Sequence, residues 1–261
     1  MPTTVPPETT FTRALVRKPG QNFSAGITTA KLGKPDYQQS LEQHNRYCAA
    51  LKQCGLKLII LNSDSAHPDA PFVEDAAVVA GESAIITHLG DGRRQGEGKR
   101  VAEELSNFFH FKTIQPPGTV DGGDVLKIGT HYYIGLSKRT NKIGATQLSD
   151  FLSSEGFTTS FIPVKGVLHL KTGITYIGNN TVVAIKQLAS RDEFKKFKVI
   201  TVDEDESYAA NCLLINGRLL IPRGFPKLKS KLQKLGYKLT EVAMSEFEKM
   251  DGGLTCLSIL F

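Results

Sequence analysis

Apolar positions along the chain follow two periods. Short runs in which apolar residues are continuous or alternate with polar ones predict strands, and apolar residues spaced three or four apart predict amphipathic helices. Strand signals recur at short intervals over almost the whole length of the chain. Strands are predicted at 11–17, 56–61, 77–80, 83–87, around 112–114, in a hairpin over 125–135, at 158–164, in a hairpin turning at 179–180, at 199–202, in a hairpin turning at 216–217, and at 237–242.

Helices are predicted between these strands, and their ends carry capping signals. Asp36 is an N-cap residue, and Gln39, three positions later, makes a weak capping box with it. Ser190 and Glu193 predict a capping box for a short helix. Phe108 falls on the apolar face of the second predicted helix. The predicted helices cover 36–54, about 97–109, about 141–155, a short segment after 190, and 226–236.

The order of these elements repeats. A unit of helix, strand, polar loop and hairpin occurs five times at a spacing of roughly 45 residues, which is typical of radial repeats. The last unit has a single strand after Cys256, and residues 11–17 supply its missing partner. Such closure removes exposed sheet edges. We therefore expect an α/β fold with one domain over residues 11–261, preceded by a flexible leader at residues 1–10.

Composition and charge narrow the class of protein. The chain has 261 residues, of which 40% are apolar and 22% charged, as in ordinary soluble globular proteins. No apolar run approaches the roughly 20 residues that span a bilayer, and the N-terminal residues lack the regions of a signal peptide. The net charge of +6 is spread over several predicted helices, which indicates solvated helix faces. We expect neither a nucleic-acid partner nor a membrane.

The cysteines indicate a reducing compartment. Cys48, Cys54, Cys212 and Cys256 show neither metal-ligand spacing nor a disulfide framework, which is typical of a cytoplasmic protein. Cys48 and Cys212 are interpreted as core residues. No metal and no cofactor are expected, although a set of Cys, His and carboxylate ligands can bind zinc adventitiously.

Polar residues occupy equivalent places in the repeats. In a ring of similar units, equivalent loops face the same centre, so the side chains of these loops are expected to converge. Cys256 follows two glycines and precedes an alternating apolar tail, which is expected to be a strand that begins at this residue. Taken alone, it would be a small buried residue. The five loops offer Glu74 and Asp75, Asp121 and Asp124, His169, Asn211, and Cys256.

This combination predicts nucleophilic catalysis on a cation. A thiol attacks, an imidazole transfers protons, and a carboxylate orients the imidazole. The surplus of carboxylates favours a planar cation, and a guanidinium pairs with carboxylates through two hydrogen bonds at a time. Two residues have structural alternatives: His169 lies between leucines, as a core histidine would, and Asp124 is interpreted as a brace of its turn.

Eight strings occur in order along the chain: LGKPDY (32–37), LEQHN (41–45), FVED (72–75), GTVDGGD (118–124), IGLSKRTN (134–141), VLHLKTG (167–173), ESYAANC (206–212) and DGGLTC (251–256). Together they resemble the dimethylarginine dimethylaminohydrolase family. This family belongs to the guanidino-group-modifying (pentein) superfamily and has a five-bladed αββαβ propeller. The resemblance covers residues 11–261 and implies cofactor-free hydrolysis of Nω-methylated arginines to citrulline and methylamine or dimethylamine. It also implies a place in arginine metabolism and nitric oxide regulation.

The resemblance also implies roles for individual residues. Cys256 is the expected nucleophile and forms a covalent thiouronium intermediate. His169 protonates the leaving amine and then deprotonates the attacking water, and Asp121 takes the third catalytic position. Asp75, with Glu74 beside it, holds the guanidinium N–H groups.

The substrate's amino-acid end is assigned in the same way. Arg139 and a second arginine bind the α-carboxylate, and the second is Arg94 or Arg93, because Leu89-Gly90-Asp91-Gly92 departs from the family pattern before them. The glycine-rich loop 18–36 matches the family's lid. The expected receptors of the α-amino group are Asp69 and the backbone carbonyls of Ile27 and Met250.

Two alternatives remain at this stage. Arginine deiminase has similar chemistry on unmethylated arginine, but such chains carry a helical insertion, and every segment between repeats is short here. A non-catalytic propeller that binds basic ligands or acidic polymers would not need Cys256, His169 and Asp121 together. The sequence leaves open whether the protein is a monomer or a homodimer.

Overall fold

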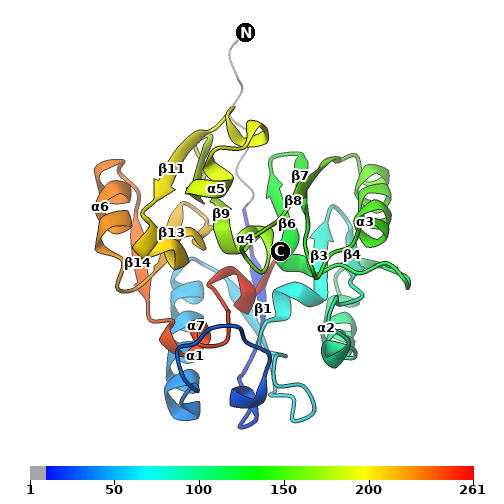
Figure 1. The fold of residues 1–261 in the computed structure, drawn as a ribbon. Helices are drawn as coiled ribbons and strands as arrows, with labels where there is room; N and C mark the ends of the chain where they lie inside the picture. The colour runs from blue at the N-terminus through cyan, green and yellow to red at the C-terminus, as the bar shows by residue number, and fades with distance from the viewer. Residues whose placement is uncertain (1–9) are drawn as a thin grey trace.

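Five small sheets surround a common centre. The structure is a computed structural model that describes residues 10–261, and in this part of the chain it contains five three-stranded sheets. In every sheet one outer pair of strands is antiparallel and the other parallel. Helices α1, α2, α3 and α6 lie at the periphery, and the last residues of the chain lie near the middle (Figure 1). This is the predicted α/β propeller architecture.

The strands have the following bounds: β1 (Arg13–Arg17), β2 (Lys57–Leu61), β3 (Ala77–Ala80), β4 (Ser83–Ile86), β5 (His110–Thr113), β6 (Val125–Ile128), β7 (His131–Leu136), β8 (Thr158–Pro163), β9 (Ile174–Tyr176), β10 (Thr181–Ile185), β11 (Lys198–Val202), β12 (Leu213–Ile215), β13 (Arg218–Pro222), β14 (Leu239–Val242) and β15 (Ile259–Leu260). The helices are α1 (Tyr37–Gln53), α2 (Gly98–Leu105), α3 (Lys142–Ser154), α4 (Leu170–Gly173), α5 (Lys186–Ala189), α6 (Pro226–Lys234) and α7 (Ser245–Glu248). The strand orders are β15-β1-β2, β3-β4-β5, β6-β7-β8, β9-β10-β11 and β12-β13-β14.

The first strand closes the ring, as predicted. β1 pairs antiparallel with β15, Ala14 opposite Leu260, and parallel with β2. The turn between β12 and β13 is also tied to this seam. Asn216 accepts a hydrogen bond from Phe11 N–H at 2.9 Å and donates one to Phe11 O at 2.9 Å. The residues that precede β1 are therefore held by the sheet of the neighbouring unit.

Helix and turn signals explain most boundaries. Asp36 caps α1 by accepting the Gln39 N–H at 2.8 Å, but the reciprocal half of the capping box is replaced, because Asp36 N–H donates to Glu246 Oε2 at 2.7 Å. Asn216 and Gly217 have φ values of 48° and 78°, which suit the two-residue turn of the β12–β13 hairpin.

Three local expectations are wrong. The capping box at 190–193 does not start an α-helix: Ser190 ends α5, and Glu193 pairs with Arg191 at 2.7 Å in a short 3₁₀ turn. Phe108 lies beyond the end of α2 and is 40% exposed. Cys256 does not begin a strand, because it lies inside the 3₁₀ turn η7 (Thr255–Leu257), three residues before β15 begins at Ile259.

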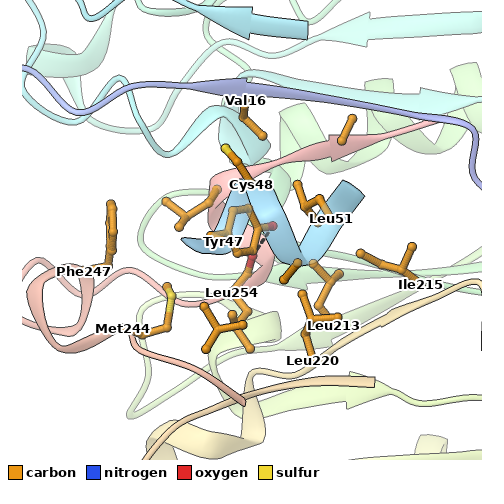
Figure 2. Packing of buried hydrophobic residues seen from close by; sticks show 14 of the residues in the cluster. Val16, Tyr47, Cys48, Leu51, Leu213, Ile215, Leu220, Met244, Phe247 and Leu254 are labelled. Carbon is orange, nitrogen blue, oxygen red and sulfur yellow. Dashed lines mark hydrogen bonds between the residues drawn. The ribbon is translucent and has the colours of Figure 1, made fainter. Parts of the chain in front are cut away.

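The hydrophobic core is divided among neighbouring units. Each of five clusters of buried side chains combines residues from two adjacent sheets and their helices. Figure 2 shows one cluster, in which Tyr47 and Leu51 of α1 pack with Leu213 and Leu220 of the neighbouring sheet β12-β13-β14. The Tyr47 hydroxyl donates to Leu254 O at 2.9 Å, which fixes the chain just before η7.

A cavity of about 250 Å³ lies between the inner strands. Residues of β3, β6, β9, β12 and β15 line it, so it follows the centre of the ring. Glu74, Lys171 and Thr255 also line it, and these residues connect it to the polar loops. Within residues 10–261, no helix has the length and apolar character that crossing a membrane requires. The predicted leader falls almost wholly on residues 1–9, outside the described residues.

Candidate active site

The polar loops form short turns directly before the inner strands. Each loop ends in one or two turns of helix, and the first strand of a sheet follows at once or within two residues. Because these turns contact one another, their side chains meet at one end of the central cavity. The turns are η2 (Val73–Ala76), η4 (Gly122–Asp124), α4, η6 (Glu204–Ala210) and η7, and they carry or adjoin Glu74 and Asp75, Asp121, His169, Asn211 and Cys256.

His169 is held by Asp121, as the sequence predicts. The imidazole Nε2 lies 3.0 Å from Asp121 Oδ2, and both side chains are buried. The other carboxylate oxygen of Asp121 accepts the Gly90 N–H at 2.8 Å. Gly123 makes the close approach possible, because a Cβ there would lie 2.7 Å from His169 Nδ1. The ring is therefore fixed between Asp121 and the backbone of η4.

The charge state of His169 follows from its surroundings. Burial disfavours the imidazolium, but the charge of Asp75, the hydrogen bond with Asp121 and the charge of Asp124 outweigh it and raise the pKa to about 9. At neutral pH the ring is therefore doubly protonated. An imidazolium is ready to donate a proton to a leaving group.

Asp75 belongs to a buried cluster of opposite charges. Arg94 Nη1 donates to Asp75 Oδ2 at 2.7 Å, and Gly123 N–H donates to Asp75 Oδ1 at 2.9 Å. Burial works against ionisation of Asp75, yet His169 and Arg94 lower its pKa to about 2. The remaining Arg94 donors go mainly to Glu97, with Nη2–Oε2 at 2.9 Å. Protein carboxylates thus already occupy the Arg94 guanidinium.

Arg93 and Arg139 meet at Asp91. The Arg93 side chain is 70% exposed and binds Asp91 through Nε at 2.9 Å and Nη2 at 2.8 Å. Arg139 Nη2 lies 3.6 Å from Asp91 Oδ2, and Arg139 Nη1 is buried without a hydrogen-bond partner. Of the two candidates, Arg93 is therefore the arginine whose donors can be transferred to an incoming carboxylate together with those of Arg139.

Glu74 connects the carboxylate cluster with the nucleophile turn. Its Oε1 accepts from Lys171 Nζ at 2.6 Å and its Oε2 accepts from the Thr255 hydroxyl at 2.8 Å. Thr255 N–H donates in turn to Asn211 Oδ1 at 3.0 Å. Burial raises the pKa of Glu74 despite Lys171. These bonds fix the residue directly before Cys256.

Cys256 is half-buried and faces an open cavity of about 670 Å³. Gly253 N–H lies 3.3 Å from Sγ. Burial, then the negative charges of Glu74 and Asp75, raise the pKa of the thiol to about 12. The empty site therefore holds a protonated thiol, and a bound cation would shift this equilibrium toward the thiolate.

The loop 18–36 borders the same cavity. Thr29, Ala30 and Leu32 line it together with Cys256. The expected receptors of an α-amino group lie close to one another at the start of this segment. Ile27 N–H donates to both oxygens of Asp69, at 3.1 and 3.0 Å, and a Cβ on Gly26 would lie 2.5 Å from Asp69 Oδ1 and 3.0 Å from Met250 Cε.

Asp124, together with two residues that were not predicted from the sequence, supports the site. Asp124 accepts from Ser137 Oγ at 2.7 Å, Thr140 Oγ1 at 2.7 Å and Leu170 N–H at 2.9 Å, which agrees with its interpretation as a brace. Thr140 and Glu97 were not expected at the site. Neither has a local signal, because their roles depend on partners in other loops.

Asp75, Asp121 and His169 resemble a metal-ligand set in geometry. One ligand atom from each lies within 4.8 Å of the others. Arg94 Nη1, however, donates to Asp75 and lies 3.9 Å from Asp121 Oδ2. A guanidinium of the protein itself therefore supplies the positive charge at this cluster.

Comparisons with known proteins agree on one family. A family model described as "N,N dimethylarginine dimethylhydrolase, eukaryotic" matches residues 29–217. The N(G),N(G)-dimethylarginine dimethylaminohydrolase of Pseudomonas aeruginosa is 41% identical over 253 residues, which are 96% of this chain and 100% of that protein. The protein of the same name from Streptomyces coelicolor is 36% identical over 250 residues, 95% of this chain and 96% of that one.

Solved structures give the same result. A cysteine-to-serine mutant of the Pseudomonas aeruginosa enzyme, complexed with citrulline, has a TM-score of 0.95 at 40% identity and covers 97% of this chain and 100% of its own. A histidine-to-glycine variant, an adduct with S-methyl-L-thiocitrulline, has a TM-score of 0.94 at 40% identity and covers 96% and 100%. The N-terminal domain of ArgZ, at 20% identity and a TM-score of 0.85 with 95% and 97% covered, shares the fold.

Proposed function

Since the chain belongs to the dimethylarginine dimethylaminohydrolase family, we propose that Cys256, His169 and Asp121 are the residues with which it hydrolyses Nω-methylated L-arginine. The enzyme is a hydrolase that converts dimethylarginine to citrulline. The observation that supports these roles best is the buried 3.0 Å contact between His169 and Asp121, in a cluster of carboxylates whose charge reaches Cys256.

The two ends of the substrate bind to separate groups of residues. Asp75 and Glu74 accept guanidinium N–H groups, because carboxylates pair with this planar cation through two bonds at a time. At the other end, Arg139 and Arg93 bind the α-carboxylate in place of Asp91. Asp69, with the carbonyls of Ile27 and Met250, receives the α-amino group. Arg94 remains in its ion pairs and keeps Asp75 charged.

The first half-reaction forms the thiouronium. The bound cation lowers the pKa of the Cys256 thiol, whose proton passes to water, and the thiolate adds to the guanidinium carbon. The bond from this carbon to the methylated nitrogen then breaks. The His169 imidazolium protonates that nitrogen, and methylamine or dimethylamine leaves. The substrate carbon stays bonded to the sulfur.

The second half-reaction reverses the role of His169. The ring is now neutral and takes a proton from water, which attacks the thiouronium carbon. The remaining hydroxyl proton passes to solvent as the carbon–sulfur bond breaks, which releases citrulline and regenerates the thiolate. Asp121 orients the ring in both steps and stabilises its charged form.

We propose that the enzyme works in the cytoplasm. Four free cysteines, three of them buried, suit a reducing cytoplasm. Within that compartment the substrate class suggests a role in arginine metabolism, including the regulation of nitric oxide. The protein acts on a small molecule and is proposed to be a monomer or a homodimer.

Steady-state kinetics on asymmetric dimethylarginine, monomethylarginine and arginine, side by side, test the substrate. We expect turnover of the methylated substrates and little or none of arginine. Faster turnover of arginine would favour the arginine deiminase reaction instead.

Cys256→Ser tests the covalent mechanism. Turnover should be abolished while binding of dimethylarginine, measured by calorimetry, is nearly retained. Cys212→Ser is a matched control, because that thiol is fully buried and bonds only to a backbone carbonyl. Retained activity in Cys256→Ser would exclude attack by this sulfur.

A further inference from the structure

We infer that Asp251 is a positioning residue that fastens the lid segment, residues 27–30, to the nucleophile loop, residues 249–256, and so assembles the receptor for the substrate's α-amino group. The inference rests on the proposed function, whose assignments it extends to a residue outside them. In Figure 1 the lid belongs to the dark blue loop before α1, which lies next to the red C-terminal part of the chain.

One carboxylate oxygen of Asp251 accepts the hydrogen bonds that hold the lid segment. Asp251 Oδ2 accepts the Thr29 N–H and the Thr29 hydroxyl, the latter at 3.0 Å, and lies 3.3 Å from the Thr28 hydroxyl. The Thr28 hydroxyl also lies 2.8 Å from Lys249 O, so its proton bonds to one or other residue of the nucleophile loop. Ala30 N–H donates back to Thr28 Oγ1 at 3.0 Å, which shapes the lid around these contacts.

A second carboxylate holds the other end of the segment. Ile27 N–H donates to both oxygens of the buried Asp69. The lid is thus bound through backbone N–H groups at Ile27 and at Thr29. The carbonyl of Ile27 lies between these two anchors along the chain, and Met250 directly precedes Asp251. Loss of the Asp251 anchor would therefore let two of the three proposed amino-group receptors separate.

The backbone supports a role for this side chain. Asp251 has φ of 58°, a left-handed conformation that glycine adopts more readily than any other residue. The next residue, Gly252, packs so closely on Phe72 that a Cβ there would lie 2.2 Å from the ring. Glycine would adopt this conformation with less strain, but the residue here is an aspartate, and its carboxylate accepts hydrogen bonds from the lid segment. Asp251 also lines the cavity with Cys256.

The inference predicts a loss that depends on the substrate. Asp251→Gly removes the acceptor and relieves the backbone, so folding should be preserved. Two or three hydrogen bonds to a charged acceptor are lost, and we expect kcat/KM for dimethylarginine to fall by about tenfold, mainly through KM. The rate of alkylation of Cys256 by 2-chloroacetamidine, which has an amidine but no amino-acid part, should change by less than about twofold.

Three further variants isolate the contact. Asp251→Asn keeps an oxygen and tolerates the left-handed conformation, so its loss should be smaller than that of Asp251→Gly. Thr29→Val removes one donor, and a double-mutant cycle with Asp251→Gly should be non-additive. Asn180→Gly replaces another left-handed residue, in the turn before β10, and should leave both reactions unchanged.

A measurement independent of turnover separates this inference from the proposed function. Hydrogen exchange at the amides of residues 27–30 should accelerate in Asp251→Gly and stay unchanged in Asn180→Gly. Unchanged exchange, or equal losses with dimethylarginine and 2-chloroacetamidine, would overturn the role of Asp251 in the lid. Failure of the wild-type enzyme to hydrolyse methylated arginine would refute the function but leave the exchange result as a test of the fastening.

Discussion

At the scale of single residues, the empty site holds two protons that the reaction must move. Burial and nearby carboxylates raise the pKa of the Cys256 thiol to about 12, and the carboxylates raise the pKa of His169 to about 9 against the effect of burial. A thiol and an imidazolium therefore share the site at neutral pH. The positive charge of the substrate is therefore needed to raise the fraction of thiolate at neutral pH.

Alkylation of the empty enzyme by iodoacetamide should depend steeply on pH. Because only the thiolate reacts, the rate at Cys256 should rise about tenfold per pH unit from pH 7 upward and should not level off by pH 9. Mass spectrometry of the modified peptide gives the rate, and Cys256→Ser supplies the background. A plateau below pH 8 would show that the resting thiol has a much lower pKa.

The residue scale also shows where sequence reasoning stops. The catalytic residues Cys256, His169 and Asp121 could be predicted from the sequence, because their positions in the repeats and the family motifs indicate the same residues. The choice between Arg93 and Arg94 could not. Two adjacent arginines have the same chemistry, and only the folded chain shows Arg94 enclosed by Asp75 and Glu97 while Arg93 stays accessible.

At the scale of elements, long periodic segments were predictable and single turns were not. α1 and α3 have caps and a clear apolar face, and the structure has both near their predicted bounds. α4 has only four residues, too few for a periodic signal. Yet this turn positions His169, because its first N–H, at Leu170, donates to Asp124. The elements that carry the chemistry are thus the least visible in the sequence.

Asp124→Asn should therefore impair both stability and rate. The amide cannot accept the three hydrogen bonds that the buried carboxylate receives, so the free energy of unfolding should fall by about 2 kcal/mol. kcat should fall as well, since the single amide oxygen cannot serve Leu170 N–H and both hydroxyls, so the bond that fixes the turn after His169 is weakened. Urea unfolding and steady-state kinetics measure the two effects.

Ser137→Ala is the matched control for this change. It removes one donor to the same carboxylate, together with the acceptor of the Arg139 and Thr140 N–H groups, and leaves the Leu170 bond in place. A smaller loss of stability and a nearly normal kcat are expected. If the control slows turnover as much as Asp124→Asn, the link through α4 is wrong.

At the scale of the whole molecule, none of the five units has a core of its own within residues 10–261. Each cluster of buried side chains is shared by two neighbours, as with Tyr47 and Leu213. We therefore propose that residues 11–261 form one domain that unfolds cooperatively. The sequence predicted this organisation from the repeat, but the repeat alone does not show that adjacent units exchange side chains.

Urea unfolding should show one transition by every probe. Far-ultraviolet circular dichroism, tyrosine fluorescence and residual activity should give coincident curves, because loss of one unit exposes the cores of both neighbours. The chain has seven tyrosines and no tryptophan, so tyrosine is the fluorescent probe. Loss of activity well before loss of ellipticity would indicate separable units.

Because β1 pairs with β15, the chain termini could lie at another point of the ring without a change in the strand pairing. Phe261 N–H donates to Arg13 O at 3.0 Å, and Thr12 N–H donates to Phe261 O at 2.8 Å, so a short peptide joining these residues would create a fifth hairpin like the other four. A circular permutant opened instead at the exposed tip between Asn179 and Asn180 would then keep every strand neighbour. Cys256 would then lie far from the C-terminus of the new sequence, yet it would face the same cavity in the folded protein.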